Sequence, residues 1–387
     1  MSRPRVLFVG RRRGALLAAA RLDVEVILLD DAGRPERAAG AHAGAKVDFA
    51  DLEGCVAAAE RLTRTKPVDA VVAVVERAVL PAAAIREALG VVGPSVEDAL
   101  PWRDKMAMKH AIEDAGIPCA RSVPVEAGTD PAALVSALGL PMVLKPRASS
   151  GSRGTVVARD LAQVSAALQD GWMAESFVRG MELSVESFVV EGQPRWVNVT
   201  DYLLPGWANV VPAAHGSRIE NAVRALNEEA IAALGVEDGV THLEAFVIDD
   251  GETVEVVFGE LAQRPPGGYL MELIARAWGF DPWLALLCIA LGRPVSFPET
   301  AARSAGVWFL HPGEGEVLGV EGLDEARNVP GVIAVDCALE VGQRISRRDG
   351  TGQHEGRVLA VTDDHASSAR ALREAMACLR VKTRAVA

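Results

Sequence analysis

Two glutamates follow apolar runs, and this pattern constrains the fold more than any other feature of the chain. Glu260 comes after the run from Val254 to Phe258, and Glu244 ends the segment Thr-His-Leu-Glu at residues 241–244. We expect both carboxylates to lie on neighbouring buried strands, because apolar residues lead into each. An unpaired buried carboxylate costs several kcal/mol, so the two acids need a compensating cation. Mg²⁺ is the expected cation, since it prefers hard oxygen ligands and shares them with phosphates.

A cation and a glycine pair follow the second of these strands. Residues 264–268 read Arg-Pro-Pro-Gly-Gly. The guanidinium of Arg264 stays protonated, and its planar fork suits a carboxylate or a phosphoryl oxygen. Two acids, a fixed cation and a Gly-Gly turn together predict a site for phosphoryl transfer onto an anionic substrate.

Length and charge exclude some classes of function. At 387 residues the chain is long enough for two or three domains with a sizeable core. Hydrophobic residues make up 50% and charged residues 24%, which is ordinary for a folded soluble protein. The formal net charge of −12 argues against a general nucleic-acid binder, which would need a basic face. We therefore expect small-molecule partners and no nucleic acid.

The cysteines and the hydropathy pattern favour a cytoplasmic protein. The five cysteines lie far apart without a C-x-x-C pair, which favours reduced packing residues over disulfides or metal ligands. The apolar run before Gly10 is too short for a secretory signal, and no run approaches the roughly 20 apolar residues of a membrane span. We expect a cytoplasmic protein that does not contact membranes.

Apolar strands alternate with helices at the N-terminus. We expect strands at residues 5–9, 24–29 and 70–75, with helices from about Gly14 and around 56–62. This alternation predicts a parallel, doubly wound sheet. The first turn holds three arginines, residues 11–13, but it lacks the G-x-G-x-x-G spacing of a dinucleotide-binding loop. We interpret it as a structural turn in a degenerate Rossmann-like domain.

The rest of the chain mixes helices with short strands. A helical stretch that carries Lys105 stops at the Gly-Pro signal of residues 115–118. Further helices are expected at 131–138, 161–168, 222–234, 271–292 and 366–380. Gly-punctuated β segments are expected at 306–310, 315–320, 331–335 and 340–344.

A lysine and a glycine-rich loop are candidates for contact with phosphate. Lys145 follows the apolar residues 141–144, so its ammonium either reaches solvent or meets an anion. Residues 149–155 read Ser-Ser-Gly-Ser-Arg-Gly-Thr, and such small residues let backbone N–H groups approach phosphate oxygens and let a loop close as a lid. An exposed lysine and a flexible hairpin tip are the alternatives. The Gly-Lys-Ser/Thr ending of a P-loop is absent.

Five segments occur in the order of the ATP-grasp enzymes, and the chain resembles the carboxylate–amine ligase branch, which includes the L-amino-acid (dipeptide) ligases. The segments span roughly residues 100 to 290 and are Asp104-Lys105, 143–146, 175–178, 180–182 and 260–268. The resemblance implies an α/β ATP-grasp fold. It would comprise an N-terminal Rossmann-like (pre-ATP-grasp) domain at 1–98, an ATP-grasp domain at 99–296 with a lid subdomain at about 120–185, and a small C-terminal β-rich α+β domain at 297–387.

The resemblance also implies an ATP site. Lys105 and Lys145 match the two phosphate-binding lysines, and Glu182 matches the acid that accepts from the ribose hydroxyls. The glycine-rich loop would contribute Ser150, Gly151, Ser152 and Gly154. The linker whose backbone reads the adenine edge would be Glu175, Ser176, Phe177 and Val178. Solvated surface charge is the alternative for Lys105, Glu175 and Glu182.

The implied metal ligands are Glu244 and Glu260, which would hold Mg²⁺ (or Mn²⁺). Many relatives carry Asn two residues after the second glutamate, and this chain has Ala262 there. This departure leaves either one tightly held ion or a second ion completed by water and phosphate. His242 shares the strand face of Glu244, and we interpret it as a satisfied core or supporting histidine rather than a direct catalyst.

The implied substrate site follows the second glutamate. Arg264 matches the catalytic residue that holds the substrate carboxylate and then the acyl-phosphate, with an ion pair to one of the two acids as the alternative. Gly267 and Gly268 match the backbone that grips the other end of the substrate. Tyr269 and Trp207 are candidates to line the pocket, although large aromatic residues often pack in the core.

The resemblance implies an ATP-dependent ligase that forms an amide through an acyl-phosphate and releases ADP and phosphate. Water would destroy the acyl-phosphate, so a closing lid over residues 149–155 is expected. One alternative is an ATP-dependent carboxylase of the biotin carboxylase or aminoimidazole ribonucleotide carboxylase type, with carboxyphosphate as the intermediate. Another is a non-catalytic ATP-binding module. We expect small-molecule carboxylate and amine substrates, ATP with Mg²⁺ as cofactors, and a homodimer.

Overall fold

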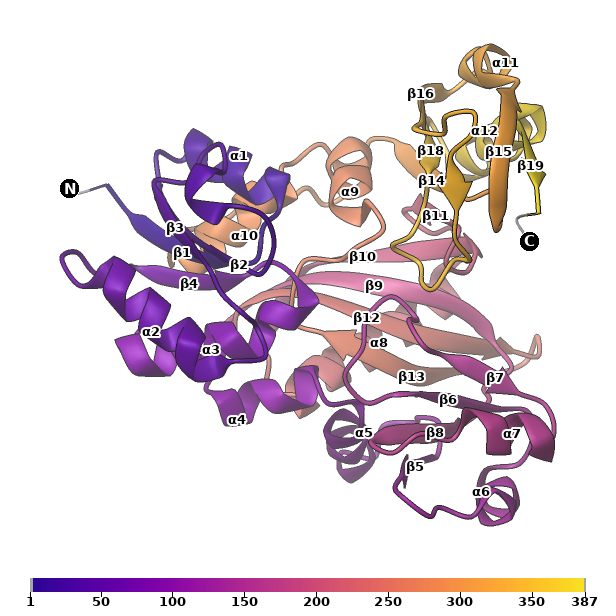
Figure 1. The fold of residues 1–387 in the computed structure, drawn as a ribbon, viewed down its shortest axis with the longest axis horizontal. Helices are drawn as coiled ribbons and strands as arrows, with labels where there is room; N and C mark the ends of the chain where they lie inside the picture. The colour runs from indigo at the N-terminus through magenta and orange to yellow at the C-terminus, as the bar shows by residue number, and fades with distance from the viewer. Residues whose placement is uncertain (1–2, 386–387) are drawn as a thin grey trace.

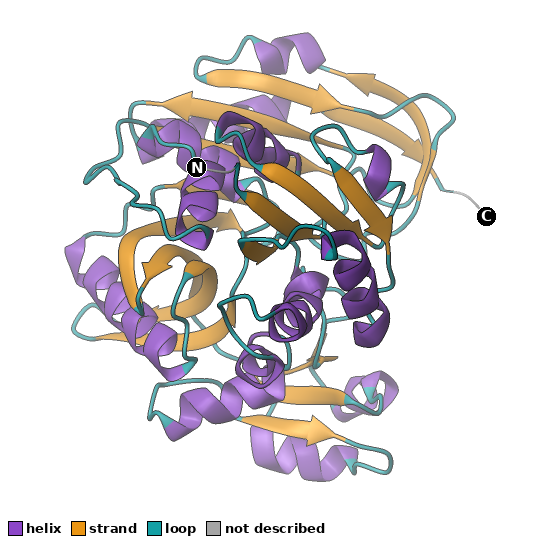
Figure 2. Cartoon of the chain, turned by 90° about the vertical axis from the view of Figure 1, so that its left-hand side faces the viewer, coloured by secondary structure: helices purple, strands orange, loops and turns teal. Residues whose placement is uncertain are grey.

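The computed structural model describes residues 3–385, and its N-terminal part is a parallel sheet between helices (Figure 1). The strand order is β3-β2-β1-β4, with β1 at Arg5–Val9, β2 at Glu25–Asp30, β3 at Ala43–Lys46 and β4 at Ala70–Ala73. The sequence predicted β1, β2 and β4 but not β3. In Figure 2 this domain faces the viewer. The α/β class predicted from strand–helix alternation is confirmed.

Alternating side chains bury both faces of this sheet. Leu7 and Val9 point into one core, shared with α2 (Leu52–Thr63) and α3 (Val79–Leu89). Val6 and Phe8 point into a second core. That second core is shared with α1 (Arg13–Arg21) and with α10 (Pro282–Ala290) from far along the chain. The N-terminal domain is therefore docked through α10 onto the centre of the molecule.

A connecting segment leads from this domain to a small lid sheet. It contains α4 (Val96–Ala99), a short 3-10 helix at Leu100–Trp102 and α5 (Lys105–Asp114). Two further 3-10 helices, Pro35–Arg37 and Glu76–Ala78, belong to the N-terminal domain. The lid sheet has the order β5-β8-β6-β7, with strands at Ser122–Val125, Trp172–Ser176, Met142–Pro146 and Val156–Ala158. Helices α6 (Pro131–Leu138) and α7 (Leu161–Ala167) pack on it through Leu134, Leu138 and Val164.

An antiparallel sheet of eight strands forms the centre of the molecule. Its order is β13-β12-β9-β10-β11-β14-β18-β16. The first five strands are β13 (Val254–Ala262), β12 (Gly239–Asp249), β9 (Met181–Val190), β10 (Gln193–Leu204) and β11 (Ala208–Val211). Helix α8 (Ser217–Ala233) shares one core with the sheet residues Leu183 and Leu243. The opposite, polar face of these strands looks toward the lid sheet.

The C-terminal strands continue the central sheet. They are β14 (Ser304–Leu310), β18 (Gly356–Thr362) and β16 (Val332–Cys337), and β11 pairs with β14 in the register Ala208↔Trp308. A three-stranded sheet follows, with β15 (Gly315–Glu321), β17 (Arg344–Ile345) and β19 (Arg380–Arg384). Helices α11 (Leu323–Arg327) and α12 (His365–Cys378) complete this part.

Two predicted elements differ from the structure, and a further strand was missed. The β segment predicted at 340–344 is wrong except for its last residue, because Gly342 has a φ of +86° and sits in a turn in which Gln343 N donates to Glu340 O. Strand β18 was not predicted. The single helix predicted at 271–292 is two helices, α9 (Leu270–Trp278) and α10, separated where Asp281 caps α10 and Pro282 occupies its first turn.

Across residues 3–385, no single helix is long and apolar enough to cross a membrane. Only α9 and α10 taken together reach that length and composition, and the chain bends by 103° between them.

Candidate active site

A row of polar side chains lies on one face of the central sheet. Successive side chains of a strand point to opposite faces, and β9, β10 and β12 each alternate apolar and polar residues over this stretch. The pairs His242↔Glu186, Glu244↔Ser184 and Glu244↔Glu260 put the polar members on the same face. The row contains Glu182, Ser184, Glu186, Asn198, Thr200, Tyr202, His242, Glu244 and Glu260.

Glu244 and Glu260 lie directly opposite each other across the β12–β13 ladder. Opposed residues have Cβ atoms about 5 Å apart, so two carboxylates here repel unless cations intervene. Lys105 Nζ lies 3.0 Å from Glu260 Oε1. Burial opposes ionisation of Glu260, but Lys105 and Lys145 hold its pKa at about 2. Burial and the neighbouring Glu244 raise the pKa of Glu182 to about 7.

These two carboxylates fit a shared Mg²⁺ site. They are hard oxygen donors on adjacent strands, and within the described chain no group of three or more His, Cys, Asp or Glu side chains is arranged to hold a metal ion. An ion here would therefore complete its shell with water and phosphate oxygens, as Mg²⁺ commonly does.

Helix α5 positions Lys105 at this pair. Asp104 caps the helix by accepting from Met106 N and Ala107 N. The same carboxylate binds Arg147 at the end of β6, with Nε–Oδ1 at 3.1 Å and Nη2–Oδ2 at 2.6 Å. The side chain of Lys105 is buried, and its ammonium donates to Ser149 O at 2.8 Å. Because the same ammonium contacts Glu260, it links Glu260 to the glycine-rich loop.

Lys145 and Glu175 face each other on the lid sheet. Lys145 Nζ lies 2.6 Å from Glu175 Oε2, and Lys109 Nζ lies 3.4 Å from Glu175 Oε1. Burial opposes ionisation of Glu175, but Lys109 and Lys145 lower its pKa overall. Burial likewise opposes the charge on Lys145, and Glu175 with Glu260 raises its pKa overall. The solvated-surface alternatives for Lys105 and Glu175 do not hold, because both side chains are buried. The sequence did not single out Lys109.

The glycine-rich loop is held by a second loop from the C-terminal part of the chain. Thr351 N donates to Gly151 O at 2.9 Å. Arg348 Nη2 donates to Gly206 O at 2.6 Å, and its guanidinium lies 3.8 Å from the ring centroid of Trp207. A Cβ at Gly151 would lie 2.9 Å from Thr351 Oγ1, so the close approach of the two loops favours glycine there.

A cavity of about 520 Å³ lies between the lid sheet and the polar face of the central sheet. It collects nearly all the residues predicted to bind ATP and metal. Those that line it are Lys105, Lys145, Ser150, Gly151, Ser152, Glu175, Ser176, Phe177, Val178, Glu182, Glu244, Glu260 and Arg264. Gly154 is not among its lining residues, and its φ of +75° serves the turn of the loop.

Arg264 is anchored by the N-terminal domain. Its Nε lies 2.5 Å from Oε2 of Glu76, a buried residue that also pairs with Arg103 at 2.8 Å. Its Nη1 donates to Pro265 O at 3.1 Å, and Nη2 makes no hydrogen bond to any residue in 3–385. The ion pair thus forms with Glu76 rather than with Glu244 or Glu260, and one edge of the guanidinium still faces the cavity.

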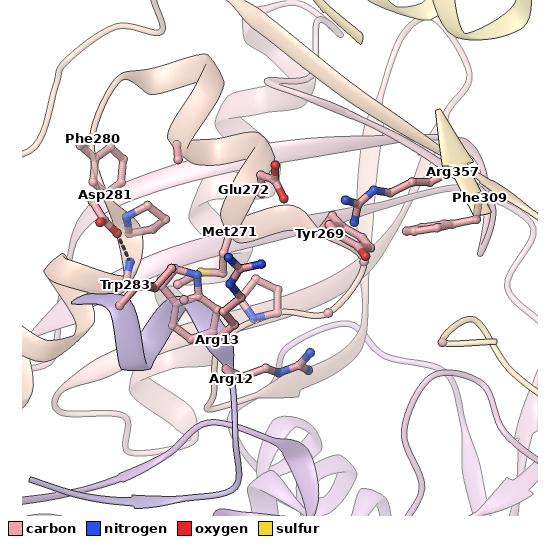
Figure 3. Close-up of a pocket in the computed structure, with 18 of the residues that line it drawn as sticks. Arg12, Arg13, Tyr269, Met271, Glu272, Phe280, Asp281, Trp283, Phe309 and Arg357 are labelled. Atoms are coloured by element: carbon pink, nitrogen blue, oxygen red, sulfur yellow. Dashed lines mark hydrogen bonds between the residues drawn. The ribbon is translucent and has the colours of Figure 1, made fainter. Parts of the chain in front are cut away.

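A second, larger cavity of about 1390 Å³ lies beside the residues that follow Arg264 in the sequence, with Tyr269 on its wall (Figure 3). Gly267, Gly268 and Tyr269 line it, whereas Trp207 lines neither cavity. Tyr269 has a φ of +59°, an uncommon backbone conformation for a residue with a side chain. The backbone at the start of α9 is thus held in a strained form next to the cavity, as often occurs at ligand sites.

A buried network supports Glu244 from behind. Glu186 accepts from Ser184, Asn198 and Thr200, and its Oε1 lies 3.0 Å from His242 Nδ1. His242 Nε2 lies 3.6 Å from Glu244 Oε1. Burial opposes the charge on His242, but Glu186 and Glu244 raise its pKa to about 9. It is therefore a charged support for Glu244 rather than a neutral base. The sequence did not single out Glu186, although its spacing from Glu182 already placed both on one strand face.

Three family models match the chain in succession. They describe an ATP-grasp N-terminal domain at residues 16–92, an ATP-grasp domain at 110–271 and an L-amino acid ligase C-terminal domain at 307–384. The chain is 23% identical over 323 residues to the L-arginine-specific L-amino acid ligase of Bacillus subtilis, covering 79% of this chain and 78% of that protein. It is 30% identical over 228 residues to a D-alanine–D-alanine ligase of Sodalis glossinidius, covering 52% and 61%.

Solved structures share the fold. The L-amino acid ligase from Bacillus licheniformis superimposes with a TM-score of 0.82 at 20% identity, covering 99% of this chain and all of that one. The N5-carboxyaminoimidazole ribonucleotide synthetase from Thermotoga maritima gives a TM-score of 0.76 at 19% identity, covering 98% of this chain and all of that one.

Proposed function

Because this chain belongs to the ATP-grasp superfamily, we propose that it is an ATP-dependent ligase that joins a carboxylate to an amine. The product is an amide, with release of ADP and phosphate. The C-terminal match and the Bacillus subtilis relative favour an amino acid as the carboxylate substrate. The expectation that the chain resembles the L-amino-acid ligase branch of this superfamily is confirmed.

The observation that carries the proposal is the position of Arg264, which lines the smaller cavity directly before the Gly267-Gly268 turn that lines the larger one. On one side lie Glu244 and Glu260 with the two lysines, in a space that suits the phosphates of ATP. On the other side the Gly267-Gly268 turn opens into a larger space. A carboxylate bound by Arg264 would thus lie where a γ-phosphoryl group can reach it.

The chemistry follows from these positions. A carboxylate is a poor electrophile, so it must gain a leaving group before an amine attacks. Lys105, Lys145 and Arg264 offset the charge of the transferring phosphoryl group and of the acyl-phosphate that forms. Mg²⁺, held by Glu244 and Glu260 when bound, supplies further positive charge at the phosphates. The paired loops at Gly151 and Thr351 cover the site, which protects the acyl-phosphate from water.

The likeness in fold to N5-carboxyaminoimidazole ribonucleotide synthetase keeps a carboxylase as the second candidate. In that case bicarbonate would receive the phosphoryl group. A non-catalytic ATP-binding module fits less well, because both acids and Arg264 are retained around the cavity.

Trapping experiments separate these candidates. With ATP, Mg²⁺ and panels of amino acids, we expect ADP release that depends on a particular acid, and hydroxylamine should trap the hydroxamate of that acid. Bicarbonate-dependent ADP release without any hydroxamate would instead establish the carboxylase.

Two variants test the role of Arg264. Arg264→Lys should lose the acid-dependent ADP release and keep ATP binding, because one ammonium cannot reproduce the two-pronged contact of a guanidinium. Arg276→Lys, on the exposed face of α9 and paired with Glu272, is the matched control and should leave the reaction unchanged.

We further propose that the protein acts as a homodimer in the cytoplasm. Light scattering of the purified chain would give its mass in solution, and a monomeric mass would contradict this proposal.

A further inference from the structure

The larger cavity carries positive charge in an acidic protein. The chain has 52 acidic and 40 basic residues. Yet the cavity is lined by Arg12, Arg13, Arg21 and Arg357 against only two acids, Glu272 and Asp281. At about 1390 Å³ it also exceeds the 300 to 1,000 Å³ of common small-molecule sites, so it has room for more than the reacting carboxylate.

Both acids in the cavity already have cationic partners. Glu272 Oε1 lies 2.9 Å from Arg276 Nη2. Asp281 Oδ2 lies 2.6 Å from Arg21 Nη1, and the same side chain caps α10. Neither acid is therefore left to neutralise the other arginines of the wall.

Arg12 and Arg13 are the two arginines of the cavity that have no acidic partner among the described residues. They project into the cavity from the start of α1 (Figure 3), and neither forms an ion pair with any residue in 3–385. Partial enclosure and the nearby charge of Arg264 lower the pKa of Arg12. Arg12 is thus repelled by the charge of Arg264, and an anion bound at Arg12 would relieve that repulsion.

The opposite wall adds a stacked arginine and an unsatisfied nitrogen. The Arg357 guanidinium lies 3.7 Å from the ring centroid of Tyr269, with its Nε 2.8 Å from Asp336. The ring of His354 stacks on Phe309 at 4.8 Å. Its buried Nδ1 has no hydrogen-bond partner in the part of the chain that the structure describes. These groups offer an unpaired imidazole nitrogen and a planar cation to a bound ligand.

We propose that the substrate in this cavity carries an anionic group remote from the reacting carboxylate, and that Arg12 and Arg13 bind this group opposite Arg357. The group is a carboxylate or a phosphate. This inference rests on the proposed function and narrows its substrate class, and it makes the N-terminal domain a determinant of specificity.

Direct binding tests the inference without requiring turnover. The full-length protein, saturated with Mg²⁺ and a nonhydrolysable ATP analogue, is titrated calorimetrically with glutamate and glutamine, aspartate and asparagine, and O-phosphoserine and serine. We expect at least one anionic member to bind about tenfold or more tightly than its neutral counterpart, a difference of about 1.4 kcal/mol. Which member it is distinguishes carboxylate from phosphate. The preference should weaken as salt is raised.

The arginine triplet supplies its own control. Arg12→Gln and Arg13→Gln should each reduce the preference for the anion, and the double variant should abolish it. Arg11→Gln should preserve it, because Arg11 does not line the cavity and lies 3.4 Å from Asp30. Equal binding within every pair, or a preference that survives in the double variant, would overturn the inference. Failure of the ligase proposal would show separately, as a bound acid that yields ADP but no hydroxamate.

Discussion

Glu244 and Glu260 are opposed on adjacent strands, but their surroundings differ. Glu260 is paired with Lys105, and its pKa is about 2, so it is ionised under all ordinary conditions. Glu244 has only longer contacts, 3.4 Å to the Tyr202 hydroxyl and 3.6 Å to His242 Nε2. Glu260 is therefore the fixed anion of the site, and Glu244 is the one with more freedom to turn toward an ion.

Glu260→Gln should abolish ADP formation while ATP affinity falls by less than about tenfold, or about 1.4 kcal/mol. Under the proposed function the carboxylate acts at the metal and the γ-phosphate, whereas adenine and ribose bind elsewhere in the cavity. Steady-state ADP release and nucleotide calorimetry measure the two effects. Glu255→Gln, on the same strand but exposed, is the control. Near-parental turnover in Glu260→Gln would refute the metal assignment.

Lys145→Ala should weaken ATP binding by about 1.5–3 kcal/mol, the usual range for hydrogen bonds to charged groups. Glu175 keeps its contact with Lys109, so the fold of the lid should survive. Calorimetry with an ATP analogue gives the affinity, and Lys66→Ala, an exposed lysine paired with Glu25, should leave it unchanged. An unaltered affinity in Lys145→Ala would mean that the ammonium does not contact phosphate.

At the scale of elements, the covering of the site is made by two loops rather than one. The glycine-rich loop was predicted from its composition. Its partner at residues 346–355 was not, because the contact is a backbone hydrogen bond between Thr351 and Gly151, some two hundred positions apart. Backbone pairing of this kind leaves no mark in residue type, so only the folded chain reveals it.

Thr351→Pro should raise the ratio of ADP to amide product, because proline removes the N–H that donates to Gly151 O. With the loops apart, water reaches the acyl-phosphate and ATP is spent without ligation. Thr351→Ala keeps the N–H and should keep the parental ratio. Quantifying ADP and amide in the same reaction provides the measurement, and equal ratios in the two variants would show that this hydrogen bond does not protect the intermediate.

Prediction from sequence succeeded where apolar runs marked buried strands. The strands that carry Glu244 and Glu260 were expected to be neighbours, and in the structure they pair directly. Prediction failed where it had to say which charged side chains meet in the folded protein. The arginines at residues 11–13 were interpreted as a structural turn, yet two of them line the larger cavity. Nothing in the N-terminal segment indicates that Tyr269 and Arg357 lie across from them.

At the scale of the whole molecule, ionic contacts connect distant parts of the chain. Glu76 joins the N-terminal domain to Arg264. On β10, Asp201 contacts both His215, which precedes α8, and His365, the first residue of α12, at 3.3 Å and 2.8 Å. The Asp201 carboxylate, 3.3 Å from His215 Nε2, raises the pKa of His215 above its usual value of about 6.5, against the effect of burial.

This cluster predicts a pH-dependent stability. Because the pKa of His215 is raised in the folded state, its contribution is fully present below about pH 6.5 and is lost as pH rises through the folded value. The melting temperature of the parent should therefore fall above pH 6.5 more steeply than that of His215→Gln. Differential scanning fluorimetry across this range measures the slopes. His110→Gln, an exposed histidine on α5, should behave as the parent. Identical slopes for His215→Gln and the parent would exclude this cluster as the source.

The pairing of β11 with β14 limits how such chains can recombine. A chimera that joins the first part of this protein to the C-terminal segment of a relative must reproduce the register Ala208↔Trp308 across the splice. It must also keep glycine at position 306, where a Cβ would lie 3.1 Å from the backbone oxygen of Asn209 in β11. A mismatched segment would leave the backbone groups of β11 that pair with β14 without partners, and such an open edge invites association between molecules. The two parts of the chain are therefore expected to vary together as one inherited unit rather than as exchangeable modules.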